Sequence, residues 1–405
     1  MLSRFVQSGR LRIVDAGGIV HDFPGKAPGP FVSVRFHDPA LPRKMFLSPG
    51  LAVGEAYMDG TLTFEDGTTL RDLFLLYGHN YQALNRYPLQ EIFHKIGRRL
   101  RGLQQYNPIG KSQEHVAHHY DLSRELFELF LDEDMQYSCG YFGDGVRTIE
   151  EAQVAKKRHI AAKLLLDDAK KILDIGCGWG GMAMTLADLA PVEVTGVTLS
   201  VEQQKLAQER AAKRGLADRV KFELRDYRHL NQQFDRIVSV GMFEHVGANY
   251  YDEFFGKVRE LLTEDGVMVL HSIGRNEPPG STSAWLRKYI FPGGYSPALS
   301  EVLAAVERQG LWVTDIEILR VHYADTLAAW NERFQARRAQ IAKLYDERFC
   351  RMWEFYLLAC ENEFRLGCCM VFQMQLARKR DAAPLTRDYM VDTERRYANM
   401  AAAAE

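Results

Sequence analysis

One glycine-rich turn constrains this chain more than any other feature. The apolar run at 171–175 carries Asp174 and is followed by Gly176, Gly178 and Gly180. Glycine adopts backbone conformations that other residues avoid, and it lets the main chain approach a ligand closely. An apolar strand that ends in such a turn is typical of a nucleotide-binding loop. We therefore expect the surrounding sequence to build a nucleotide-binding fold.

Two interpretations of the turn compete. Gly176, Gly178 and Gly181 fit the G-x-G-x-x-G pattern of dinucleotide-binding proteins. Gly176, Gly178 and Gly180 fit equally well the D-x-G-x-G-x-G form that is typical of methyltransferases that use S-adenosylmethionine (SAM).

The second predicted strand favours SAM. A dinucleotide site needs an acidic residue at the end of that strand to bind the ribose hydroxyls. Glu193 stands at its start, and the hydroxyls of Thr198 and Ser200 stand at its end. Asp174 suits the charged methionine end of SAM, which has no pyrophosphate. SAM is therefore the predicted cofactor.

Strands and helices alternate after residue 170, which predicts an α/β fold with a doubly wound, Rossmann-like parallel sheet. Ligands then bind beyond the carboxyl ends of the strands. Further apolar segments at 311–321 and 368–376 predict two more strands, and the aromatic-rich interval 325–365 predicts inserted lid helices. The first five strands are expected at 171–175, 193–198, 220–224, 234–240 and 267–271, with helices from Gly181, at 201–213 and at 250–262.

The chain divides by pattern into three parts. Short alternating segments and Pro-Gly pairs predict a small α+β domain at 1–83. A basic helical linker is expected at 84–114, and the catalytic domain at 115–405.

Composition narrows the class of protein. The net charge of -2 argues against nucleic acid as a partner. No segment approaches the roughly 20 apolar residues of a spanning helix, and the first residues lack the apolar core of a signal peptide, so we expect a cytoplasmic protein. The six cysteines form no C-x-x-C pair, which predicts free thiols and no metal site.

Several separate segments together resemble the cyclopropane fatty acid synthase family of SAM-dependent enzymes. They span about residues 115–380 in the family's order. The N-terminal residues match more loosely, mainly at 54–60. The matching segments are HYDL at 119–122, YSCGYF at 137–142, LDIGCGWG at 173–180, GVTLS at 196–200, GMFEHVG at 241–247, HSIG at 271–274 and YIFPGG at 289–294.

The resemblance implies a reaction. The family adds a methylene group across a cis double bond of an unsaturated phospholipid acyl chain. The olefin attacks the sulfonium methyl of SAM, and a bound bicarbonate removes a proton from the new methyl group so that the ring closes. A related lipid methyltransferase that leaves a methyl-branched or methylene product is the alternative.

The resemblance also implies two sets of site residues. The bicarbonate ligands would be Cys139, Glu244, His271, the backbone of Ile273, and Tyr323. SAM would be held by Tyr137, Ser138, Asp174, Gly176, Gly178, Gly180, Thr198, Leu199, Gln203, Asp226 and Tyr227. The other five cysteines are expected to be buried apolar residues. The aromatic side chains near these motifs, Phe243 among them, are expected to line a dry pocket.

Membrane contact is a further expectation. The stretch 84–103 carries Lys95, Arg98, Arg99 and Arg101 and is interpreted either as a solvated interdomain helix or as a helix on an anionic membrane surface. A lipid substrate favours the second interpretation and peripheral association with the inner face of the membrane. The segment 285–291 is a second candidate contact. The family also suggests a homodimer.

Overall fold

The computed structural model describes residues 2–85 and 122–402. Contacts divide the chain into two compact units. One contains the N-terminal region together with 280–292 and 324–369, and the other contains the remaining described residues. Most of the expected linker at 84–114 lies outside the described residues, so the domain boundaries there stay predictions.

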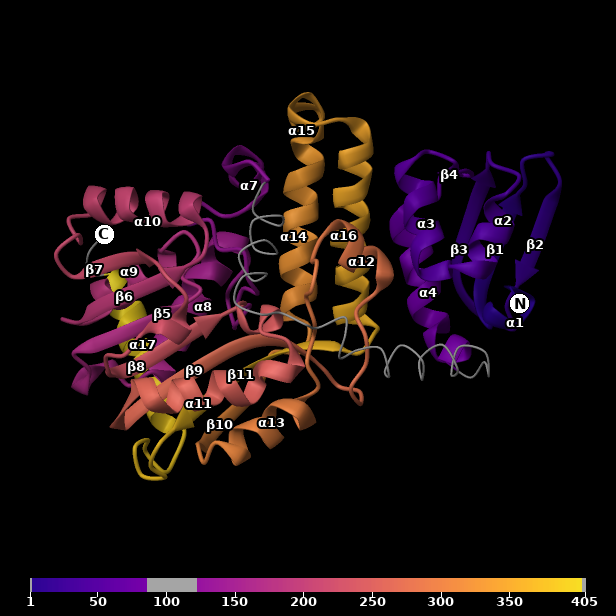
Figure 1. Cartoon of the computed structure of the whole chain (residues 1–405). Coiled ribbons are helices and arrows are strands. Elements are labelled where there is room, and N and C mark those ends of the chain that lie inside the picture. Colours follow the sequence, from indigo (N-terminus) through magenta and orange to yellow (C-terminus); the bar gives the residue numbers. More distant parts are fainter. Residues whose placement is uncertain (1, 86–121, 403–405) are drawn as a thin grey trace. The chain divides into compact units, whose positions relative to one another are not determined.

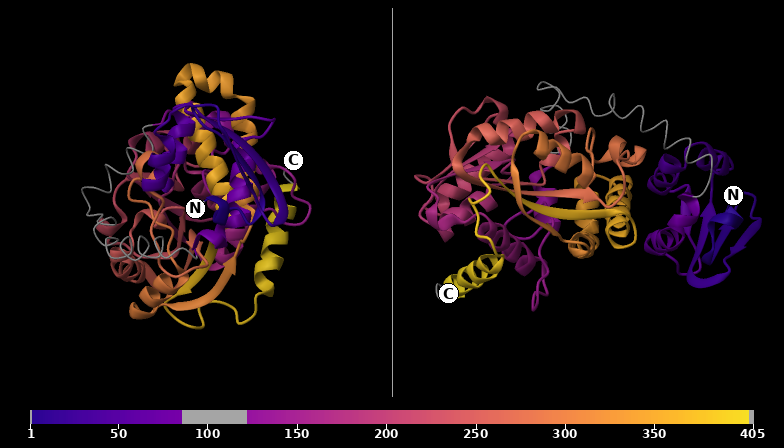
Figure 2. Two further views of the ribbon diagram at one scale, coloured as in Figure 1. Left: turned by 90° about the vertical axis from the view of Figure 1, so that its right-hand side faces the viewer. Right: turned by 90° about the horizontal axis from the view of Figure 1, so that it is seen from below.

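The first unit contains a small sheet and helices from distant parts of the sequence. Its strands β1 (Ser8–Val14), β2 (Val20–Pro24), β3 (Ala27–Phe36) and β4 (Leu62–Phe64) lie in the order β2-β1-β3-β4 and are drawn in indigo in Figure 2. Leu11, Val32 and Leu76 are part of its apolar core. The helices of this unit are α1 (Leu2–Phe5), α2 (Leu41–Leu47), α3 (Pro49–Met58), α4 (Leu70–Asn85), α12 (Ala284–Tyr289), most of α14 (His322–Ala336), α15 (Arg338–Leu344) and α16 (Glu347–Arg365).

The second unit is built on a seven-stranded sheet with the order β10-β11-β9-β8-β5-β6-β7. β5 pairs with β6 on one side and with β8 on the other, so the strand order reverses at β5. The strands are β5 (Lys171–Ile175), β6 (Glu193–Thr198), β7 (Val220–Leu224), β8 (Phe234–Val240), β9 (Leu262–Arg275), β10 (Trp312–Ile318) and β11 (Cys369–Ala377).

The predicted α/β sheet is confirmed, with one difference in strand direction. The pairs from β7 to β9 are parallel, but β10 and β11 run antiparallel to each other. Strand β9 is also longer than the expected 267–271. Three consecutive helices, α14, α15 and α16, separate β10 from β11 in the sequence, so the simple alternation of one strand with one helix does not extend to this pair.

Helices cover both faces of this sheet, as Figure 1 shows. Neighbouring residues of one strand point to opposite faces, so Leu173 packs in one core and Ile172 in the other. The helices of this unit are α7 (Arg124–Phe130), α8 (Ile149–Lys163), α9 (Gly181–Leu189), α10 (Val201–Lys213), α11 (Tyr251–Leu261), α13 (Leu299–Arg308) and α17 (Asp388–Ala402), with short 3-10 turns between them at Leu166–Asp168, Tyr227–His229, Phe243–His245 and Ala248–Tyr250.

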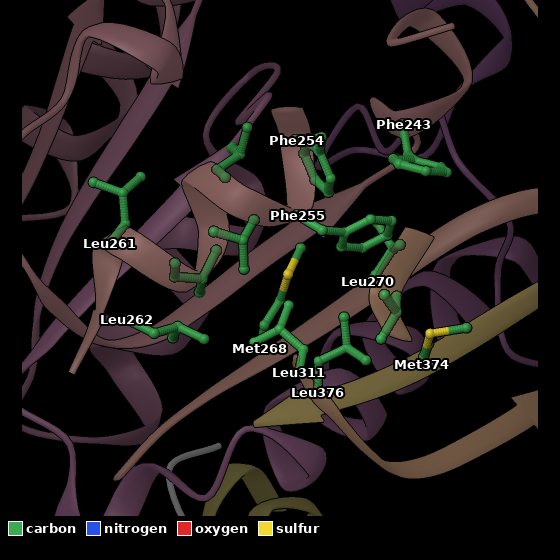
Figure 3. Packing of buried hydrophobic residues seen from close by; sticks show 14 of the residues in the cluster. Phe243, Phe254, Phe255, Leu261, Leu262, Met268, Leu270, Leu311, Met374 and Leu376 are labelled. Atoms are coloured by element: carbon green, nitrogen blue, oxygen red, sulfur yellow. The ribbon is translucent and has the colours of Figure 1, made fainter. Parts of the chain in front are cut away.

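Figure 3 shows the core on the α11 face. Phe254, Phe255 and Leu261 of α11 meet Met268 and Leu270 of β9, and all five are almost completely buried. This packing fixes the ends of β8 and β9, where the candidate site begins.

Candidate active site

The glycine turn lies at the carboxyl end of β5, where the strand order reverses. Gly176, Gly178 and Gly180 have positive φ angles of 79°, 51° and 84°, whereas Gly181 is the first residue of α9. All three glycines of the SAM pattern therefore adopt the left-handed conformation that favours glycine. A Cβ at Gly178 would meet no atom within 4 Å, so the backbone there is open to a ligand.

Asp174 lies beside this turn and is 1% exposed. Its Oδ2 is buried and has no hydrogen-bond partner among the described residues. Burial raises the pKa of this carboxyl to about 7. A buried carboxylate oxygen without a partner is destabilising unless a cation or a donor reaches it. The charged methionine end of SAM would supply one, so Asp174 fits the predicted cofactor.

A buried lysine that sequence analysis missed lies near this carboxylate. Lys156 projects from α8, which begins with a capping box between Thr148 and Glu151. Its Nζ donates 2.8 Å to Oγ of Ser138 and 2.6 Å to Oε1 of Gln136. Burial lowers the pKa of this amine to about 8. Lys156 thus anchors the loop that carries Ser138.

Tyr137, which precedes Ser138, packs against two phenylalanine rings. Its ring centroid lies 5.3 Å from that of Phe127 and 6.3 Å from that of Phe130, both in α7. The loop at 137–139 is therefore fixed from two sides, by aromatic packing and by the buried ammonium group.

Thr198 and Gln203 meet at the end of β6. The Thr198 hydroxyl donates to Oε1 of Gln203 at 2.9 Å, and both side chains are buried. The Ser200 hydroxyl caps α10 by accepting from the Gln203 N–H. The contact with Thr198 involves only the amide oxygen of Gln203, and the predicted contact of its NH₂ group with the ribose of SAM stays a prediction. Leu199 lies between them and is partly exposed.

Asp226 and Tyr227, which are predicted to bind SAM, already have side-chain contacts within the protein. Oδ1 of Asp226 accepts from the backbone N–H and Nε of Arg228, and Oδ2 accepts from Nη2 of Arg228 at 2.6 Å. The Tyr227 ring packs edge-on against Phe254 of the apolar core. Their contact with SAM stays a prediction.

Three residues of the second predicted set lie just after β8 or within β9: Glu244, His271 and Ile273. The Ile273 N–H donates to Oε1 of Glu244 at 2.6 Å. Oε2 of Glu244 is buried without a partner among the described residues, and burial raises the pKa of this carboxyl to about 7. The Gly241 N–H donates to the carbonyl oxygen of His271 at 2.9 Å, which joins the residue after β8 to strand β9.

His271 and Cys139 are both buried in this second unit. Burial, with the positive charges of Lys156 and Lys163, lowers the pKa of His271 well below its usual value, so the imidazole is neutral. The Cys139 thiol contacts the carbonyl oxygen of Gly140, with a sulfur–oxygen distance of 3.2 Å.

Tyr323 is also buried, next to a residue that is tied to the cysteine loop. Nδ1 of His322 accepts from the Phe142 N–H at 2.8 Å. The Tyr141 ring stacks on both His322 and His159, with centroids 5.0 and 4.1 Å away. The segment that carries Cys139 is therefore attached to the start of α14.

Burial distinguishes some of the predicted apolar positions. Phe243 is completely buried and stacks on Tyr251 in the core beside α11. In the segment 285–291, Trp285 and Ile290 are 2% and 4% exposed, and the membrane contact of this segment stays a prediction. The other membrane candidate, 92–103, and the HYDL motif up to residue 121 lie outside the described residues.

Metal-ligating side chains outside this site form one group among the described residues. Glu363, Cys368 and Cys369 place three ligand atoms within 4.8 Å of one another. None of them belongs to either predicted set, and all six cysteines are free thiols. In the part of the chain that the structure describes, no helix has the length and apolar character to cross a bilayer.

Comparisons with known proteins give a consistent result. The family model described as mycolic acid cyclopropane synthetase matches residues 109–374. The cyclopropane-fatty-acyl-phospholipid synthase of Escherichia coli K12 is 39% identical over 356 residues, which cover 87% of this chain and 89% of the relative. The tuberculostearic acid methyltransferase of Mycobacterium tuberculosis is 39% identical over 284 residues, or 66% of each chain.

Solved structures agree in fold. A mycolic acid cyclopropane synthase complexed with SAH and CTAB is 35% identical and has a TM-score of 0.62. The alignment covers 65% of this chain and 97% of that one.

Proposed function

Because the chain belongs to the mycolic acid cyclopropane synthetase family, we propose that it is a cyclopropane-fatty-acyl-phospholipid synthase that uses SAM and bicarbonate. One observation carries the proposal. Asp174 lies near the end of β5, Glu244 follows the neighbouring parallel strand β8, and each keeps one buried carboxylate oxygen without a partner among the described residues. The unpartnered oxygen of Asp174 suits contact with a cation. The unpartnered oxygen of Glu244 suits contact with a group that exchanges a proton.

The residues around the glycine turn would hold SAM. When bound, SAM supplies an electrophilic methyl group. Asp174 would pair with its positive charge, the open backbone at Gly178 would lie against it, and Gln203 would donate to a ribose hydroxyl. Lys156 keeps Ser138 in place and so shapes the same pocket.

The second set offers both donors and an acceptor for a small oxyanion. When bound, bicarbonate supplies the base that takes a proton from the transferred carbon. The neutral His271 and the Tyr323 hydroxyl would be donors, and the Cys139 thiol would donate by turning away from the Gly140 carbonyl oxygen. Glu244, whose pKa lies at about 7, can accept or return a proton near neutral pH. These residues would thus orient the base and reset its protonation state.

The substrate proposed here is a phospholipid with unsaturated acyl chains in a membrane. Such a substrate requires contact with a bilayer, and the proposed contact is the basic stretch at 92–103 on the cytoplasmic face. A salt-sensitive affinity for anionic vesicles would support it, because each basic residue near such a surface contributes about 1 kcal/mol. A homodimer is also proposed, by analogy with the family.

A methyl-branching or methylene-forming lipid methyltransferase is the second candidate, since one relative carries the name of such an enzyme. Product analysis separates the candidates. Purified protein is incubated with SAM and vesicles of a monounsaturated phospholipid, and the acyl chains are analysed by mass spectrometry before and after mild hydrogenation. A cyclopropane is one CH₂ group heavier than the parent chain and resists hydrogenation. A methylene product takes up two hydrogens, and no mass change would contradict both candidates.

A further inference from the structure

A buried glutamine in β11 lies next to His271, one of the residues of the proposed site. Gln373 is completely buried in a strand that is otherwise mostly apolar. Its Nε2 lies 3.2 Å from Nδ1 of His271. A buried polar side chain in such a strand requires partners, and those partners define what Gln373 does.

A second contact fixes the orientation of the Gln373 amide. Nζ of Lys163, on α8, donates to Oε1 of Gln373 at 2.7 Å, and Lys163 is 1% exposed. An ammonium group can only donate, so it selects the amide oxygen. The NH₂ group of Gln373 must then point the other way, toward His271.

The lysine is itself held in place. Glu317 of β10 accepts from Nζ of Lys163 and from Nε2 of His159, the latter at 2.7 Å. Nδ1 of His159 lies 3.0 Å from the Glu394 carboxylate of α17. The chain of contacts therefore runs from a surface helix through Lys163 and Gln373 to His271.

We propose that Gln373, oriented by Lys163, is a positioning residue that fixes the tautomer of His271. The Gln373 NH₂ donates to Nδ1, so the single proton of the neutral imidazole resides on Nε2. His271 then presents an N–H donor to the proposed bicarbonate site. The use of that donor to bind bicarbonate rests on the proposed function. The tautomer of His271, in contrast, is a property of the protein alone.

Gln373→Glu is the sharpest variant. A carboxylate can only accept, so it would draw the imidazole proton to Nδ1 and leave Nε2 as an acceptor. Lys163 lies beside the new charge and favours folding of the variant. Gln375→Glu is the matched control, because Gln375 lies in the same strand and contacts the Lys163 carbonyl and Tyr389 but not His271.

The measurement is the nitrogen-15 NMR spectrum of ring-labelled histidine, with the His271 signals assigned by their loss in His271→Gln. We expect the Nε2–H tautomer in the wild-type protein and in Gln375→Glu, and the Nδ1–H tautomer in Gln373→Glu. Turnover of Gln373→Glu should fall by about 10²-fold or more at unchanged SAM affinity.

A wild-type His271 protonated on Nδ1, or an unchanged tautomer in Gln373→Glu, would overturn the inference. If Gln373→Glu does not fold, the wild-type spectrum alone decides. A wild-type protein with the expected tautomer but no cyclopropane product would instead contradict the proposed function.

Discussion

The backbone N–H of Ile273 donates a 2.6 Å hydrogen bond to one carboxylate oxygen of Glu244, while the other oxygen is buried without a partner among the described residues. This contact orients the side chain across the ends of β8 and β9 and leaves the second oxygen for chemistry. Burial also raises the pKa of the carboxyl to about 7. Both observations support the proton-exchanging role that we propose for Glu244.

Glu244→Gln should reduce turnover by about 10²-fold or more, because an amide keeps the shape but cannot take up a proton. SAM affinity, measured by calorimetry, should change little, since Glu244 is one of the predicted bicarbonate ligands and not one of the predicted SAM ligands. Glu264→Gln, which removes an exposed carboxylate of β9, is the control and should keep full turnover. Normal turnover in Glu244→Gln would remove this residue from the mechanism.

Asp174→Asn should weaken SAM binding by about 10- to 100-fold, because a hydrogen bond to a charged group contributes about 1.5–3 kcal/mol. Calorimetric titration with SAM measures this loss. Asp188→Asn, in an exposed salt bridge with Arg214, is the matched control. Equal affinities for the two variants would contradict the assignment of Asp174.

The contribution of Asp174 to the stability of the ligand-free protein should fall as the pH rises from about 4 to about 7. The pKa of Asp174 is raised by burial from 3.8 to about 7, so the folded state binds a proton that the unfolded state has released. This contribution is complete below the unfolded value and is lost as the pH rises through the folded value.

Thermal unfolding of wild type and Asp174→Asn across this range measures the contribution of that one group. The variant should gain stability relative to the wild type as the pH rises. A difference that is independent of pH would show that the carboxyl stays ionised in the folded protein.

The core of α11 should be sensitive to truncation. Leu261 is 1% exposed within the cluster of Figure 3, and Leu261→Ala should lower the free energy of unfolding by about 2–5 kcal/mol. Leu224 of β7 is 43% exposed, and Leu224→Ala should cost far less. Chemical denaturation compares the two variants, and equal costs would argue against this core.

Chelation should leave turnover unchanged. The three donors that approach each other, Glu363, Cys368 and Cys369, lie outside both predicted sets of site residues. Activity is measured after dialysis against EDTA, with and without added zinc. A loss that zinc restores would assign a metal to the reaction.

Sequence patterns predicted the strands at 171–175, 193–198, 220–224 and 234–240 with the bounds that the structure has. These strands are short, apolar and separated by helices with clear start signals, such as Ser200. The antiparallel β10–β11 pair was missed because direction depends on long connections and not on local residues.

The buried polar contacts were also missed, for a physical reason. Lys156, His159 and Lys163 lie on a helix where charged residues are ordinarily solvated, and only the tertiary fold buries them. Gln373 and Gln375 were a usable signal, because two glutamines at spacing two in an apolar strand place polar groups on one buried face.

In the proposed reaction, a base in this site removes a proton from the carbon that SAM donates. Vesicles of a monounsaturated phospholipid are incubated with SAM whose sulfonium methyl is trideuterated, and the acyl product is analysed by mass spectrometry. We expect a product that retains two of the three deuterons, formed faster when bicarbonate is present. A product that retains all three, or no product, would contradict the proposed reaction.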